Sequence, residues 1–191
     1  LMDLLTARLA RHPDMHVYHY APYEPAALKR LMGRYARHED TIDRMLRAGL
    51  FVDLCAITKQ TLRASVESYS IKDLEPFYGF ERTGELRQAA ACVRAVQIAI
   101  GRGDTHALPE DIQEQVAAYN RDDCISTFHL RLWLETLRQS RIAAGAAIPR
   151  PEPGDPEPSE ELSAERKRAA AAISALTAGI PDDPAARSPD Q

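Results

Sequence analysis

The sequence predicts an α/β fold in which helices outnumber strands. Residues 15–20 alternate in polarity and residues 50–54 are apolar, as expected for two short buried strands. Elsewhere, apolar residues recur every three or four positions, which is typical of amphipathic helices. We therefore expect a small sheet covered by helices.

The predicted helices follow the chain in order. The second begins at Glu24-Pro25, since proline suits a first turn. Ser70 and Ser159 precede helical segments and carry hydroxyls that can cap them. The expected helices are residues 1–10, 25–35, 38–48, 55–62, 70–74, 84–100, 109–141 and 159–178.

The composition changes after Arg141. Residues 149–158 are rich in proline, which favours an extended, poorly packed linker. We expect an α/β domain at 1–141, a linker at 142–158, and a short helix with a polar tail at 159–191. Because the helical pattern is already present at Leu1, we also expect an excerpt that begins inside a domain.

The overall composition is that of a soluble globular protein, with 45% hydrophobic and 27% charged residues among 191. The three cysteines are widely spaced and form no disulfide framework, which favours a reducing, cytoplasmic compartment. No apolar run is long enough to span a bilayer, so we expect no membrane partner.

Charge is distributed unevenly along the chain. Residues 142–191 carry 5 of the 24 basic and 9 of the 28 acidic residues, which leaves 19 of each in residues 1–141. A neutral body argues against strong nonspecific binding of nucleic acid through charge alone. It is compatible with a nuclease cleft, where local positive potential and metal ions suffice.

The segment from Tyr119 to Cys124 is the main candidate for chemistry. A helical projection at 100° per residue places Asp123 within an apolar stripe and Asp122 about 60° outside it. We therefore expect Asp123 to be buried and Asp122 to be ordinary surface. The other members of the stripe are Val116, Tyr119, Ser126, Leu130, Leu134 and Leu137.

A buried carboxylate needs a partner, which leaves two interpretations of Asp123. It is either a capping or salt-bridged core residue, or a metal ligand with Tyr119 beside it. Glu24 presents a similar choice. It comes after a strand, where active sites of α/β proteins gather, but an acidic side chain in a first helical turn is also favoured by the helix dipole.

Four segments together resemble a known family. The chain is similar to the RNase H-like DEDD 3′–5′ exonucleases, most of all the predicted nuclease domain of bacterial RecB-like putative nucleases, over about residues 1–137. The segments are Tyr20-x-x-Tyr23-Glu24, Val52-Asp53-Leu54, Tyr69-Ser70-Ile71-Lys72-Asp73-Leu74 and Tyr119-Asn120-Arg121-Asp122-Asp123-Cys124.

The resemblance implies a two-metal site that hydrolyses phosphodiesters. By resemblance, Asp123 is the fourth metal-binding carboxylate and Tyr119 orients the attacking water. Glu24 stands where the family usually has aspartate. Such all-oxygen ligation suits Mg²⁺ or Mn²⁺. Tyr20, Tyr23 and Lys72 are candidate nucleic-acid contacts, although Lys72 also fits an ordinary solvated helix lysine.

One departure from the family matters. No Asp-x-Glu precedes Glu24 on a strand, so the chain holds about two of the four ligands. We therefore expect a partial RNase H-like fold that is inactive alone. We expect it to be flanked by an upstream nuclease segment and a downstream helicase, to serve DNA repair, and to act on DNA more than RNA.

Two other functions remain open. One is a noncatalytic nucleic-acid-binding or interdomain packing module with a degenerate metal site. The other is a helical interaction protein.

Several further residues suggest sites that we consider weak. His106 and Asp111 match a family variant, but Pro109 interrupts it. His12, His16 and His19 lack zinc-ligand spacing, so we expect surface or strand-end histidines. We expect Asp53 to cap the helix that begins near Cys55, with a fifth acidic group as the alternative. We expect Cys124 to be a small core or surface residue.

Overall fold

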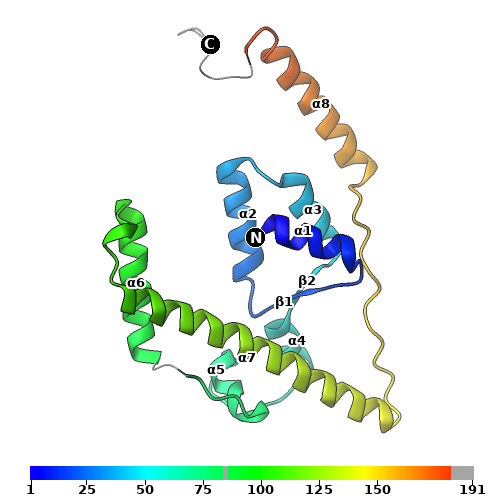
Figure 1. Cartoon of the computed structure of the whole chain (residues 1–191). Helices are drawn as coiled ribbons and strands as arrows, with labels where there is room; N and C mark the ends of the chain where they lie inside the picture. Colours follow the sequence, from blue (N-terminus) through cyan, green and yellow to red (C-terminus); the bar gives the residue numbers. More distant parts are fainter. Residues whose placement is uncertain (84–85, 182–191) are drawn as a thin grey trace.

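A computed structural model describes residues 1–83 and 86–181. Two strands, β1 (Val17–His19) and β2 (Phe51–Asp53), pair in parallel with Val17 opposite Phe51 and His19 opposite Asp53. Both are shorter than the sequence predicts, since only their central residues form the ladder. The helix-rich chain with a small parallel sheet is a partial α/β fold (Figure 1).

Helices occupy most of the remaining chain. None in the described ranges is both long and apolar enough to cross a membrane. The α-helices are α1 (Met2–Arg11), α2 (Tyr23–Tyr35), α3 (Glu39–Arg47), α4 (Leu54–Thr61), α5 (Ile71–Leu74), α6 (Leu86–Arg102), α7 (Glu110–Ala143) and α8 (Glu160–Leu176). Two 3₁₀ helices, η1 (Glu75–Tyr78) and η2 (Thr105–Ala107), precede α6 and α7.

The main hydrophobic core lies on one side of the strands, beneath α1, α2 and α3 (Figure 1). Its buried members come from α1, α3 and the residue before β2, and partly buried side chains of α2 and both strands contribute to it. The buried residues are Met2, Ile42, Met45 and Leu50.

The opposite side of the strands faces α7. The Arg131 guanidinium of α7 lies over the Tyr18 ring, 5.5 Å from its centroid, whereas Val17 packs into the main core. Successive strand residues thus face opposite sides, as strand geometry requires. Helix α4 packs against both β1 and α7.

Asp53 joins the ends of the two strands. Its Oδ1 accepts the N–H groups of Cys55 and Ala56, which caps α4, and also that of Ala21, at 2.9 Å. The predicted capping role is confirmed. Because backbone groups of both post-strand segments bind this carboxylate, Asp53 fixes where the chain leaves the sheet.

An aromatic turn fastens η1 to α7. The Phe77 and Tyr78 rings lie 6.2 and 6.1 Å from that of Trp133, and the Phe80 ring meets His129 edge-on. Gly79 has φ of 65°, a left-handed conformation that glycine adopts without strain. This turn directs the chain after η1 back toward α7.

The proline-rich linker returns to α3. At Gly154 a Cβ atom would fall on the carbonyl oxygen of Arg47. The side chain of Glu157 pairs with Arg44 at 2.9 Å, and Arg166 of α8 pairs with Asp43 at 2.9 Å. Ser159 caps α8 through the N–H of Leu162, as predicted. The predicted polar tail falls largely on residues 182–191, outside the described range, as does the predicted helix start at Gly84.

Two leucines of α7 provide a test of this packing. Leu130 is fully buried and Leu132 is 42% exposed. We expect Leu130→Ala to lower the free energy of unfolding by about 2–5 kcal/mol, because it leaves a cavity. Leu132→Ala, with the same chemical change on the same helix, should cost about 0.5 kcal/mol. Urea denaturation measures both, and equal losses would contradict the proposed packing.

Candidate functional site

The two aspartates of α7 reverse the predicted assignment. Asp122 is 3% exposed, whereas the Asp123 side chain is 38% exposed. The buried line runs through Asp122, Ser126 and Leu130, in helical steps of four. The prediction that Asp123 is buried and Asp122 is surface was wrong. Ser126 and Leu130 of the predicted stripe are buried, but the buried face extends to the Asp122 side of that stripe and leaves Asp123 at its edge.

Asp122 has a structural partner. Its Oδ2 accepts the backbone N–H of Thr83 at 2.9 Å, and the Thr83 hydroxyl donates to the carboxylate at 3.1 Å. These bonds satisfy the buried carboxylate. They fasten the segment after η1 to α7.

A buried ion pair lies next to this anchor. Arg82 Nε donates to both oxygens of Glu75, at 2.9 and 3.0 Å, and Nη2 donates to Oε1 at 2.6 Å. The two side chains are only 7% and 9% exposed. The planar guanidinium matches a carboxylate in this geometry, so Glu75 holds Arg82 firmly in place.

Two hydroxyls extend this network. Ser126 donates to Glu75 Oε1 at 2.8 Å, and the Tyr78 hydroxyl lies 2.8 Å from Ser126 Oγ. Burial raises the pKa of Tyr78 to about 12, opposed by the bond to Ser126 and assisted by the charge of Glu75. Tyr78 is therefore a neutral phenol at physiological pH.

Asp123 meets the other end of the same guanidinium. Its Oδ1 lies 2.8 Å from Arg82 Nη1. The two atoms form an ion pair, and neither, although buried, makes a hydrogen bond within the described part of the chain. Burial alone would lower the pKa of Arg82, but its contacts with Glu75 and Asp123 hold it above the ordinary value. Of the two carboxylates that pair with Arg82, Glu75 accepts hydrogen bonds from it and Asp123 does not.

The Tyr119 side chain contacts two cations, Lys72 and Arg82. Lys72 Nζ donates to the Tyr119 hydroxyl at 3.0 Å and lies 5.0 Å from the ring centroid. The Arg82 guanidinium carbon lies 5.7 Å from the same centroid. Both are cation–π distances. The predicted residues Lys72, Tyr119 and Asp123 therefore gather, together with Arg82, at one place on α7.

The predicted residues near the sheet have other partners. Glu24 lies in the first turn of α2, after β1, and its Oε2 is 3.8 Å from His19 Nδ1. The Tyr20 hydroxyl donates to the carbonyl of Tyr69, and burial, with a contact from Cys55, raises the pKa of Tyr20. Tyr23 is 70% exposed. Glu24 and Asp123 thus face different partners, His19 and Arg82.

The weaker candidates have structural explanations. His12 and His16 are exposed, and His19 is buried at the end of β1 with Nδ1 2.7 Å from the Ala21 carbonyl oxygen. Cys124 is exposed. His106 belongs to η2, whereas Asp111 belongs to α7. These arrangements agree with our expectations for all of these residues.

A metal centre requires several converging donors. Within the ranges that the structure describes, no group of three or more histidine, cysteine, aspartate or glutamate residues could hold a metal ion. Asp123 Oδ1 is occupied by a guanidinium, and Glu24 faces His19. These residues do not by themselves fit a two-metal site.

The prediction from sequence missed Glu75 and Arg82. One signal could have identified Glu75, because it is the only charged residue in the otherwise apolar run from Leu74 to Phe80. A carboxylate in such a run needs a buried cation. Nothing in the sequence singles out Arg82, which becomes its partner only through the turn at Gly79.

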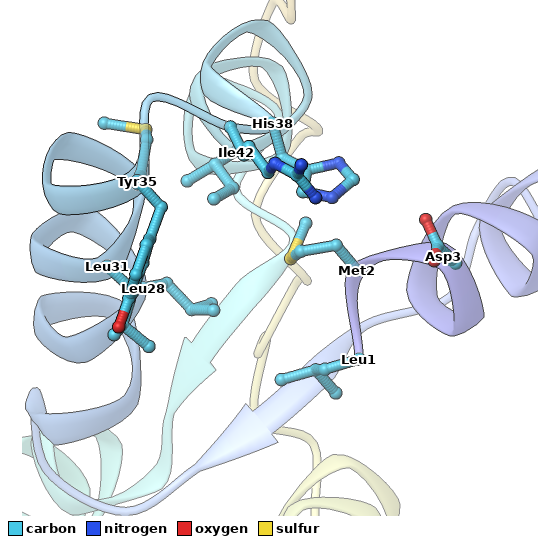
Figure 2. A pocket seen from close by; sticks show the side chains of 10 residues that line it. Leu1, Met2, Asp3, Leu28, Leu31, Tyr35, His38 and Ile42 are labelled. Carbon is cyan, nitrogen blue, oxygen red and sulfur yellow. The ribbon is translucent and has the colours of Figure 1, made fainter. Parts of the chain in front are cut away.

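A separate hydrophobic groove opens between α1, α2 and α3. Figure 2 shows Met2 of α1 near Leu28 of α2 and Ile42 of α3. The charged or imidazole side chains that line it are those of Asp3, Arg37 and His38. Lys72 and Arg82 instead meet Tyr119 and Asp123 at the surface of α7. We therefore place the candidate site at Tyr119 and Asp123.

Comparison with known families agrees with this architecture. A family model described as the RNase H superfamily matches residues 1–135. The chain therefore belongs to the RNase H superfamily. RNase H-like domains have a nuclease-type fold and bind nucleic acid. No curated protein and no solved structure matches the chain.

The Glu75–Arg82 pair predicts a large loss of stability when one partner is removed. Arg82→Gln leaves the buried Glu75 charge without its cation, so unfolding should become easier by about 3–5 kcal/mol. Arg44→Gln, which breaks the exposed pair with Glu157, should cost at most about 1 kcal/mol. The measurement is thermal or urea unfolding of both variants beside the wild-type chain.

The double variant Glu75→Gln/Arg82→Gln provides the control. It removes both charges and should regain much of the stability that Arg82→Gln loses. If the double variant loses as much stability as Glu75→Gln and Arg82→Gln lose in sum, the two side chains do not interact.

Proposed function

We propose that this chain forms part of a nuclease-type domain that acts on the phosphodiester bonds of nucleic acid. The supporting observation is the cluster on α7. There, two cations lie within cation–π distance of the Tyr119 ring, beside the partly exposed carboxylate of Asp123. Lysine and arginine bind phosphates, and a carboxylate next to the bound phosphate is where metal-assisted hydrolysis requires one.

Each residue of the cluster has a role in this proposal. Lys72 and Arg82 bind the phosphodiester, and Tyr119 fixes the two cations and orients water. Asp123 would be one carboxylate ligand for Mg²⁺ or Mn²⁺ when it is not paired with Arg82. Glu24 would be a second carboxylate ligand, after a change of partner.

The finer assignment is based on the resemblance to DEDD enzymes. We propose 3′–5′ exonuclease polarity, with DNA preferred to RNA. We also propose a helicase-linked role in cytoplasmic DNA repair, as in RecB-like putative nucleases.

A noncatalytic nucleic-acid-binding module is the second candidate. Asp123 and Glu24 face Arg82 and His19 respectively, and the charges of residues 1–141 cancel. These features favour a degenerate metal site. Both candidates bind nucleic acid, so hydrolysis discriminates between them.

The binding step can be tested with labelled single-stranded DNA. Lys72→Gln should weaken binding and reduce the slope of log affinity against log salt by about 0.7, as for one lost phosphate contact. Lys59→Gln removes an exposed lysine of α4 and should leave affinity and slope close to wild type. Fluorescence anisotropy at several salt concentrations measures both. Equal effects of the two variants would exclude Lys72 as a specific contact.

Hydrolysis can be tested on the same chain. With Mn²⁺ and single-stranded DNA we expect no robust cleavage, because the described residues provide no group of three metal donors. Denaturing gel electrophoresis detects the products. Robust cleavage that EDTA abolishes and Asp123→Asn removes would contradict this expectation and would establish a complete site.

A further inference from the structure

The Arg82 guanidinium is hydrogen-bonded through Nε and Nη2 but not through Nη1. Nε and Nη2 are held by Glu75 through three hydrogen bonds, which keep the guanidinium in place. Nη1 and Asp123 Oδ1 form an ion pair at 2.8 Å, and neither of these buried atoms makes a hydrogen bond within the described ranges. Of the two anions on Arg82, Asp123 is therefore the one that can be exchanged at lower cost.

Asp123 also covers Nη1. Both facing atoms are buried, but the Asp123 side chain as a whole is 38% exposed, so its exposed surface belongs to its other atoms. A rotation of this side chain toward solvent would uncover Nη1 while Glu75 keeps Arg82 in place. The uncovered nitrogen would lie beside the Tyr119 ring, which Lys72 also contacts.

We propose that Asp123 is an exchangeable cover on a phosphate-binding guanidinium, and that a phosphodiester of nucleic acid replaces it on Arg82 Nη1. The exchange substitutes one singly charged anion for another, so the buried charge of Arg82 remains balanced. Guanidinium groups bind phosphate oxygens through short charge-assisted bonds. Arg82 is thus a binding residue, and Asp123 competes with its ligand. This inference depends on the proposed function, because it concerns the same site.

The decisive variant is Asp123→Asn, studied in EDTA so that no metal contributes. It keeps the side-chain shape and removes the competing charge. We expect it to tighten binding of labelled single-stranded DNA about tenfold, as for one charge-assisted hydrogen bond gained. Glu81→Gln removes a charge from an exposed side chain one residue before Arg82, and should change affinity by less than about twofold.

The gain must also depend on Arg82. In the background Glu75→Gln/Arg82→Gln, Asp123→Asn should give no gain. An equal gain in that background, or equal gains from Asp123→Asn and Glu81→Gln, would overturn the inference as a general charge effect. Absence of DNA binding by both the wild-type chain and Asp123→Asn would overturn the proposed function as well.

A second measurement applies if the double variant does not fold. The guanidinium NMR signals of Arg82 in the wild-type chain, assigned by their loss in Arg82→Lys, should shift when the oligonucleotide is added. Unchanged signals would overturn the inference. If inorganic phosphate at the same concentration shifts them equally, the ligand is phosphate in general and nucleic acid is excluded as its specific partner.

Discussion

The arrangement of the candidate site depends on one buried ion pair, Glu75 with Arg82. The aromatic turn packs their segment against α7, and the paired charges add a second constraint on the chain after Gly79. A buried carboxylate and a buried guanidinium are costly anywhere except opposite one another. Once Arg82 is in place, Asp123 has a cation to face and the Tyr119 ring has a second cation beside it.

Local signals in the sequence predicted much of the fold. The strand segments, the Ser70 and Ser159 caps and the Asp53 cap all depend on neighbouring residues, and each occurs where expected. The register of a long helix is harder to predict. A helical projection with no external reference does not fix the edges of the buried face, and at Asp122 and Asp123 that error exchanges a structural residue for a candidate ligand.

The site was only partly predictable for a related reason. Lys72, Tyr119 and Asp123 stand in segments that resemble a family, and the fold brings them together. Arg82 has no such context, since its role arises from a contact with Glu75 and with a helix residue far along the chain, Asp123. Charge balance across long sequence separations is absent from periodicity and propensity, which describe only near neighbours.

The contact between Gly154 and α3 also constrains α8, which comes after the linker. Arg150 pairs with Glu135 of α7, and at Gly154 the backbone lies against Arg47, so the linker is held at both points. Beyond Gly154, Glu157 pairs with Arg44 and Arg166 of α8 pairs with Asp43, both on α3. Because salt screens ion pairs near the surface, rising ionic strength should weaken the hold of these two pairs on α8.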